Sequence, residues 1–137
     1  MSQWVSDIED MHEKFGVHKV VDAFDAETLL KFIEFRLDFL QEELDEARAA
    51  LKARDADGIV DALIDLNVVS TGSLDLLQVN AELAWKRVHE KNMQKKVGIK
   101  AGRKNPLGLP DLVKPEGWEP PEHTDNIGLL WKIVDKQ

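Results

Sequence analysis

The chain has 137 residues, enough for one domain with a core of its own, and it contains no cysteine. The lack of cysteine excludes disulfides, thiolate metal sites and cysteine nucleophiles. The net charge of −8 argues against binding to nucleic-acid polymers. No apolar run approaches the roughly 20 residues of a membrane span, and the N-terminus lacks the pattern of a signal peptide. We therefore expect a cytoplasmic protein with no membrane partner.

The first predicted element is a helix over residues 2–15. Ser2 or Ser6 is a candidate cap, and Gly16 ends the helix. Residues 17–24 then form a connector. Three further helices follow, over about residues 25–54, 55–77 and 80–98. Their candidate caps are Asp25, Asp55 or Asp57, and Asn80.

The chain changes character at Gly98. From there onward it carries all five prolines and five of the eight glycines, and no alternating strand pattern is visible. We expect a single domain over residues 1–137, with a helical core at about 2–98 and an arm at 99–137. The fold class is all-α, a bundle of four to five helices.

The long helix over residues 25–54 carries a cluster of acidic residues beside two apolar stripes. One stripe is predicted to face the core and consists of Ile33, Leu37, Leu40, Leu44, Ala47 and Leu51. Glu42 and Asp45 fall on the opposite, solvated side. Glu43 and Glu46 instead share a strip with Phe32, Phe35, Phe39 and Ala50. A carboxylate on a buried apolar strip is costly unless a cation meets it, so Glu43 and Glu46 are candidate metal ligands. The alternative is that both are ordinary surface glutamates.

The next helix is apolar on nearly every side, which predicts a central position. Asp61 and Asp65 lie one turn apart, so both could reach the same divalent cation. Gly72 and Asp75 fall close to the same line, and Gly72 would let a ligand or a neighbouring backbone come close. The alternative for Asp61 is an acid favoured at the positive end of the helix dipole.

Residues 86–104 hold eight basic residues and one acid, whereas residues 22–65 hold 13 acids and five bases. Lys91, Asn92 and Lys95 suit phosphate oxygens, the lysines by charge and the asparagine by hydrogen bonding. An acidic and a basic segment could meet around one ligand that carries both metal and phosphate. The alternative is two solvated faces of opposite sign.

Four segments, in this order, are similar to the motifs of one enzyme family. They are His12-Glu13-Lys14-Phe15-Gly16; Arg36 followed by Glu42-Glu43-Leu44-Asp45-Glu46; Asp61-Ala62-Leu63-Ile64-Asp65-Leu66 followed by Gly72; and His89-Glu90-Lys91-Asn92-Met93-Gln94-Lys95. The chain resembles the MazG-like, all-α nucleoside triphosphate pyrophosphohydrolases of the phage and bacterial stand-alone type. One departure concerns the second metal motif, usually Glu-x-x-Asp, because position 62 is alanine here. Asp61 is the candidate to replace the missing glutamate.

The resemblance implies hydrolysis of a nucleoside triphosphate to the monophosphate and pyrophosphate. It implies two or more Mg²⁺ ions, or Mn²⁺, held by Glu43, Glu46, Asp61 and Asp65. Glu43 and Glu46 are the implied catalytic residues, with Glu46 the candidate general base for the attacking water. Phosphate binding falls to Asn92, Lys95, Lys91 and Lys114. Phe15 and Trp118 are available for the base.

The resemblance also implies a homodimer or homotetramer, with the strip of Phe32, Phe35 and Phe39 as one candidate contact. A purine deoxynucleotide such as dGTP is the favoured substrate, in a bacterial or phage-infected cytoplasm. The alternatives within the fold are a dUTP, dCTP or damaged-nucleotide hydrolase and a phosphoribosyl-ATP hydrolase. The alternative of another class is a non-catalytic helical module whose acids bind a basic partner.

Overall fold

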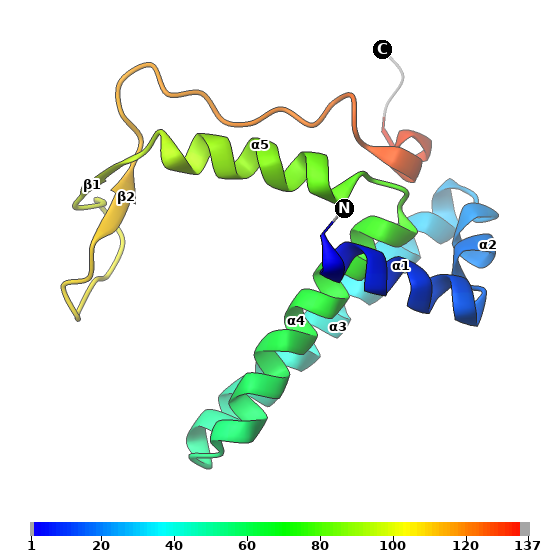
Figure 1. Ribbon diagram of the computed structural model, residues 1–137, viewed down its shortest axis with the longest axis horizontal. Helices are drawn as coiled ribbons and strands as arrows, with labels where there is room; N and C mark the ends of the chain where they lie inside the picture. Colours follow the sequence, from blue (N-terminus) through cyan, green and yellow to red (C-terminus); the bar gives the residue numbers. More distant parts are fainter. Residues whose placement is uncertain (1, 135–137) are drawn as a thin grey trace. The chain divides into compact units, whose positions relative to one another are not determined.

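The computed structural model describes residues 2–134. Its elements in chain order are α1 (Gln3–Phe15), α2 (Val17–Asp22), α3 (Ala26–Lys52), α4 (Ala56–Leu76), α5 (Ala81–Met93), β1 (Lys96–Gly98), β2 (Asp111–Val113) and the 3₁₀ helix η1 (Gly128–Lys132) (Figure 1). The prediction of an all-α fold is confirmed, because five α-helices dominate these residues and the two strands have three residues each. No helix in residues 2–134 has both the length and the apolar character needed to cross a membrane.

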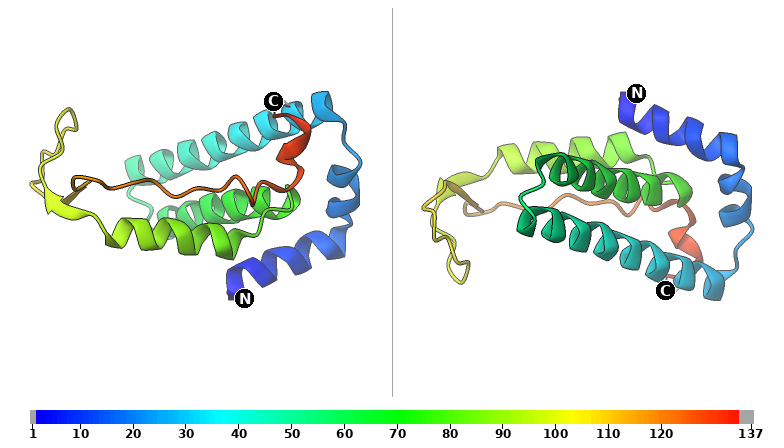
Figure 2. Two further views of the ribbon diagram at one scale, coloured as in Figure 1. Left: turned by 90° about the horizontal axis from the view of Figure 1, so that it is seen from above. Right: turned by 90° about the horizontal axis from the view of Figure 1, so that it is seen from below.

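The described residues form two units. The first runs up to Glu82 and includes the segment from Asn126, and the second runs from Leu83 to Asp125. In the first unit, α3 and α4 pack side by side as an antiparallel hairpin, and α1 and α2 pack against α4 (Figures 1 and 2).

The helix boundaries follow from local chemistry. The Ser2 hydroxyl accepts from the Val5 N–H, and Asp25 and Asp55 cap α3 and α4 by accepting from Thr28 and Gly58. Gly16 ends α1 in the left-handed conformation, with φ 69°. These capping predictions are confirmed.

The core of the first unit lies where α2, the start of α3, the end of α4 and η1 meet. Its buried side chains are Val21, Leu29, Leu76, Leu77 and Leu129. The C-terminal segment is fixed there because the Leu129 N–H donates to the Leu77 carbonyl at 2.7 Å. Gly128 precedes it with φ 51°, and a side chain at that position would collide with the same carbonyl. The arm predicted for residues 99–137 therefore returns to the helical unit at Leu129.

Two local predictions are wrong. Residues 17–22 form α2 instead of a connector, because Val21 is anchored in the core. The fourth helix ends at Met93 and not near Gly98, because residues 96–98 pair with 111–113 as an antiparallel ladder. Such pairing joins residues far apart in the chain, and three-residue strands are too short to show alternation.

The stripe predicted to face the core of α3 is also wrong in part. Leu37, Leu44 and Leu51 are 59%, 37% and 56% exposed, whereas Ile33, Leu40 and Ala47 are half-buried. The strip with Phe32 and Phe39 takes the inner position instead: both are half-buried and Phe32 packs on the core, although Phe35 is 60% exposed. A two-helix hairpin buries only the face between its helices, which is why one apolar stripe of α3 stays open within this unit.

Candidate active site

Four carboxylates face one another across the α3–α4 hairpin, near enough for Glu46, Asp61 and Asp65 to act electrostatically on Glu43. Glu43 and Glu46 lie one turn apart on α3, and Asp61 and Asp65 lie one turn apart on α4. The connection between the helices spans only Ala53 to Asp55, so the second half of α3 lies beside the first half of α4. Gly58 allows this close approach, because a side chain there would press on Ala50 of α3 and on the capping carboxylate of Asp55.

Glu43 is the buried member of this cluster. It is 8% exposed, and its Oε2 is buried without a hydrogen-bond donor among the described residues. Burial, with the nearby charges of Glu46, Asp65 and Asp61, raises the pKa of the Glu43 carboxyl above its usual value. An ionised carboxyl in this position is disfavoured both by its burial and by the charge of its neighbours. The site therefore needs either a proton or a cation.

The other three acids differ in exposure. Asp65 is half-buried, whereas Glu46 and Asp61 are exposed, so the expectation that Glu46 lies on a buried surface is wrong. Ala62 points inward and is 3% exposed. Asp61 is near enough to raise the pKa of Glu43, although it is the weakest of the three neighbouring acids. The predicted separation of Glu43 from the solvated Glu42 and Asp45 is confirmed, since both of these are exposed.

Arg36 ties the two helices together farther along the hairpin, near Gly72. Its guanidinium donates to Ser73 Oγ at 2.8 Å and to the Val69 carbonyl at 3.0 Å, and burial lowers its pKa. A side chain at Gly72 would come within 3.0 Å of this guanidinium and 3.2 Å of the His12 ring. The close approach expected at Gly72 is therefore made by two side chains of the same protein.

The second unit gathers most of the predicted phosphate-binding residues around Trp118. The Lys95 and Lys114 ammonium groups lie 5.2 and 5.1 Å from the centre of its ring. Its indole N–H donates to the Lys91 carbonyl at 2.9 Å, and Asn92 is exposed on the same helix turn. Trp118 thus contacts both lysines and is anchored to α5, a structural role that its position in a proline-rich segment did not reveal.

Phe15 lies in the first unit, at the end of α1. Its ring is 69% exposed and the Lys14 ammonium lies 5.5 Å from its centre. The ring is open to a stacking partner.

The profile of the phosphoribosyl-ATP pyrophosphohydrolase family matches residues 10–92, more than half of the chain. The chain belongs to this family. The family is part of the MazG-like, all-α pyrophosphohydrolase superfamily, so the resemblance seen in the sequence is confirmed. Its members are hydrolases that act on phosphoric anhydrides. Comparisons with curated proteins and with solved structures gave no match.

The family match covers all four carboxylates and ends at Asn92. Lys95, Lys114 and Trp118 lie beyond it, so the lysine pair around Trp118 is a feature of this chain outside the matched pyrophosphohydrolase region. The donor set within the match is all oxygen, which suits hard divalent cations such as Mg²⁺. The unpartnered Oε2 of Glu43 is the kind of atom that such a cation would satisfy. The residues present therefore fit the divalent metal that is typical of MazG-like pyrophosphohydrolases.

One group of three residues is not predicted by any sequence motif. His12, His18 and Asp75 come from α1, α2 and α4, and their ligand-type atoms lie within 4.8 Å of one another. Their only sequence signal was the position of His12 in the first motif and of Asp75 on the line of Gly72. The contact depends on how α1 and α2 pack on α4.

Proposed function

We propose that this protein is a metal-dependent nucleoside triphosphate pyrophosphohydrolase, which releases the nucleoside monophosphate and pyrophosphate. The observation that carries the proposal is the buried Glu43 carboxylate, with one unpartnered oxygen and three other acids around it. Four carboxylates repel a polyphosphate, so these residues serve such a substrate only when cations lie between them. Membership of a pyrophosphohydrolase family supports the same reaction class.

Glu43, Glu46, Asp61 and Asp65 are the proposed metal ligands. Bound Mg²⁺ or Mn²⁺ would neutralise the phosphates and make a water molecule more acidic. Glu43, buried between the helices, supplies a fixed ligand oxygen. Glu46 is exposed, so its carboxylate has the freedom to accept the proton of the attacking water as well as to bind metal.

Phosphate binding is proposed for the second unit. Lys95 and Lys114 both contact the ring of Trp118, so this part of the second unit offers two positive charges to phosphate oxygens. Asn92 and Lys91 add a hydrogen-bond donor and a further charge from α5. Such charges stabilise the pyrophosphate as it leaves. Phe15 is proposed to stack on the base, because its ring is open.

The proposed substrate is a nucleoside triphosphate, with purine deoxynucleotides such as dGTP first to be tested. Phosphoribosyl-ATP gives its name to the family and is the first alternative. The pyrimidine deoxynucleotides dUTP and dCTP, and damaged nucleotides, come next.

Self-association is proposed through the open apolar stripe of the hairpin. Leu37, Leu44 and Leu51 recur every seven residues and so share one line of α3. Val60, Leu63 and Ile64, which lie within one helix turn of each other on α4, are 63%, 57% and 44% exposed. Exposed apolar side chains that gather in this way favour contact with another protein surface, and a second copy of the same hairpin offers a matching one.

The reaction is tested with a panel of NTPs, dNTPs and phosphoribosyl-ATP, each with Mg²⁺ or Mn²⁺ and with products separated by chromatography. We expect a monophosphate and pyrophosphate for at least one triphosphate, and no turnover with EDTA. Asp65→Asn should lower kcat/KM by roughly 100-fold or more, because it removes a ligand charge. Asp57→Asn, an exposed aspartate on the same helix, is the matched control and should stay near wild type.

Two outcomes would overturn the proposal. Formation of a nucleoside diphosphate and orthophosphate would show that the enzyme removes the terminal phosphate and does not release pyrophosphate. Failure to turn over any nucleotide, together with no binding of Mg²⁺ or Mn²⁺ in calorimetry, would favour a non-catalytic helical module whose acids bind a basic partner.

A further inference from the structure

A second group of possible metal ligands lies at the other end of α4 from the four carboxylates. Asp75 Oδ2 accepts from His12 Nδ1 at 2.6 Å and from His18 Nε2 at 2.7 Å. The His12 and Asp75 side chains are 7% and 15% exposed, and that of His18 is 26% exposed. Asp75 follows Asp65 by ten residues, or about 15 Å along the helix axis, so this group is distinct from the carboxylate cluster.

The donor atoms differ in kind from those of the proposed active site. They are two imidazole nitrogens and one carboxylate oxygen, all within 4.8 Å of one another. Such a mixed set suits zinc and neighbouring transition metals, whereas Mg²⁺ prefers oxygen ligands and a shell of water. The shifts needed for metal–ligand distances of about 2.0–2.2 Å are small, because the three atoms already converge.

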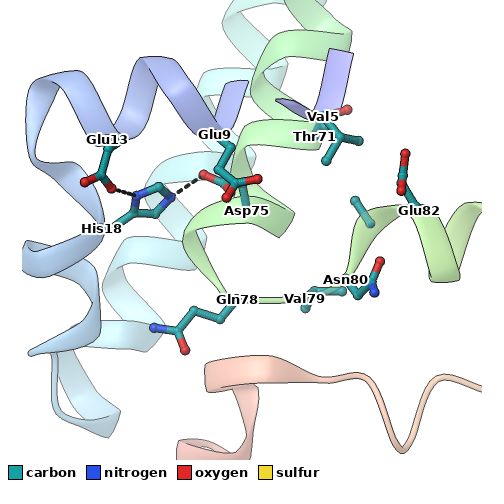
Figure 3. A pocket seen from close by; sticks show the side chains of 11 residues that line it. Val5, Glu9, Glu13, His18, Thr71, Asp75, Gln78, Val79, Asn80 and Glu82 are labelled. Atoms are coloured by element: carbon teal, nitrogen blue, oxygen red, sulfur yellow. Dashed lines mark hydrogen bonds and ion pairs between the residues drawn. The ribbon is translucent and has the colours of Figure 1, made fainter. Parts of the chain in front are cut away.

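A carboxylate also lies beside the other nitrogen of His18, just beyond hydrogen-bonding distance. This nitrogen, Nδ1, lies 3.6 Å from a carboxylate oxygen of Glu13, and Figure 3 shows the imidazole between Glu13 and Asp75. Histidines that bind metals usually donate their second N–H to such a partner, which fixes the tautomer and the ring orientation.

The group also opens onto a cavity. A pocket of about 550 Å³ is lined by His18 and Asp75 together with Glu9 and Glu13 (Figure 3). Three protein ligands with an open side are typical of zinc sites that keep a fourth position for water or an exogenous ligand, whereas structural zinc sites are closed by four protein ligands.

We propose that His12, His18 and Asp75 form a binding site for a Zn²⁺-class divalent cation, with an open coordination position toward this pocket. The three ligands come from α1, α2 and α4, so a bound ion would fix the two N-terminal helices onto the hairpin. The alternative is a purely hydrogen-bonded group, in which the two imidazoles donate to Asp75 and no metal is needed.

The test is calorimetric titration of the full chain with Zn²⁺, after removal of metals with a chelator and in saturating Mg²⁺ to occupy the carboxylate cluster. We expect one Zn²⁺ per chain and a rise in Tm. His18→Gln should weaken Zn²⁺ binding at least about 100-fold, since loss of an outer partner alone costs 10–100-fold. Glu13→Gln removes that outer partner from a largely exposed position and should weaken binding about tenfold without harm to the fold.

Two controls separate this site from other histidines and from the active site. His89→Gln changes an exposed histidine of the second unit and should bind Zn²⁺ like the wild type. Glu43→Gln should also keep the Zn²⁺ site, so loss of turnover in that variant leaves this proposal standing. Co²⁺ as a second probe should give the intense visible absorption of a low-coordinate nitrogen-containing site. A wild type that binds no Zn²⁺ above the Mg²⁺ background would overturn the proposal, as would a folded His18→Gln variant that binds with unchanged affinity.

Discussion

The two ends of the α3–α4 hairpin differ in which side chains they bury. At the end near α2 and η1, Leu29 and Leu76 are 0% and 2% exposed and form an apolar core. Toward the connection between the helices, Leu51 is 56% exposed while the carboxylate of Glu43 is buried. The first end is stabilised by the hydrophobic effect. The second end buries a charged side chain and exposes a leucine.

This difference separates the part of the hairpin that maintains the fold from the part adapted to bind. An apolar core needs nothing from outside, because burial itself is favourable. A buried carboxylate beside three others raises the free energy of the folded chain unless a proton or a cation is present. Burial of the exposed leucines against another surface would likewise lower the free energy. The acidic end therefore depends on its ligands, and the following changes test that dependence.

The largest effect on the free energy of unfolding is expected at the apolar end. Leu29→Ala should lower the free energy of unfolding by about 2–5 kcal/mol, because it leaves a cavity in a fully buried position. The same change at the acidic end, Leu51→Ala, should cost the isolated chain less than about 0.5 kcal/mol. Urea denaturation followed by circular dichroism measures both. Equal losses for the two variants would contradict the division of the hairpin.

Glu43→Gln should affect stability and activity in opposite directions. In metal-free protein the substitution should raise Tm, because it removes a charge that burial and the neighbouring acids disfavour. Addition of Mg²⁺ should raise the Tm of the wild type more than that of the variant. The variant should also lose turnover. Glu42→Gln, at the exposed neighbouring position, is the matched control and should change neither quantity appreciably.

The pH dependence of the metal-free protein follows from the raised pKa of Glu43. Between the unfolded and the folded pKa the folded chain binds more protons, so the free energy of unfolding falls as the pH rises through this window. Thermal unfolding in EDTA across a pH series should show this slope in the wild type and a flatter one in Glu43→Gln. A Tm that rises with pH over the same window, or a lower Tm for Glu43→Gln, would show that Glu43 is well accommodated without metal.

The smallest effect on the chain itself is expected for Leu51→Lys. The side chain is exposed, so the free energy of unfolding of a single chain should change by less than about 0.5 kcal/mol. The variant should nevertheless shift the protein toward a smaller species in size-exclusion chromatography with light scattering, because a charge would enter the proposed contact. Gln41→Lys, on a polar face of the same helix, should leave the mass unchanged. A wild type that is already monomeric at high concentration would exclude this contact.

Local chemistry made much of the fold predictable. Ser2, Asp25 and Asp55 are caps that act within three residues, and Gly16 ends its helix by backbone conformation alone. The distinction between Glu42 and Glu43 also followed from helical periodicity, because neighbouring residues point about 100° apart. The elements missed were those fixed by distant partners: α2 through Val21 in the core, and the strand pairing of residues 96–98 with 111–113.

The helices, their caps, and the pairs of acids one turn apart on two of them could be predicted without knowledge of the packing. Three features depend on how the helices pack: which stripe of α3 faces α4, the burial of Glu43 but not of Glu46, and the contact of His12 and His18 with Asp75. The physical reason is the range of the interactions. Caps and periodicity act within a turn or two of helix, whereas burial depends on which segments far apart in the chain come to cover one another.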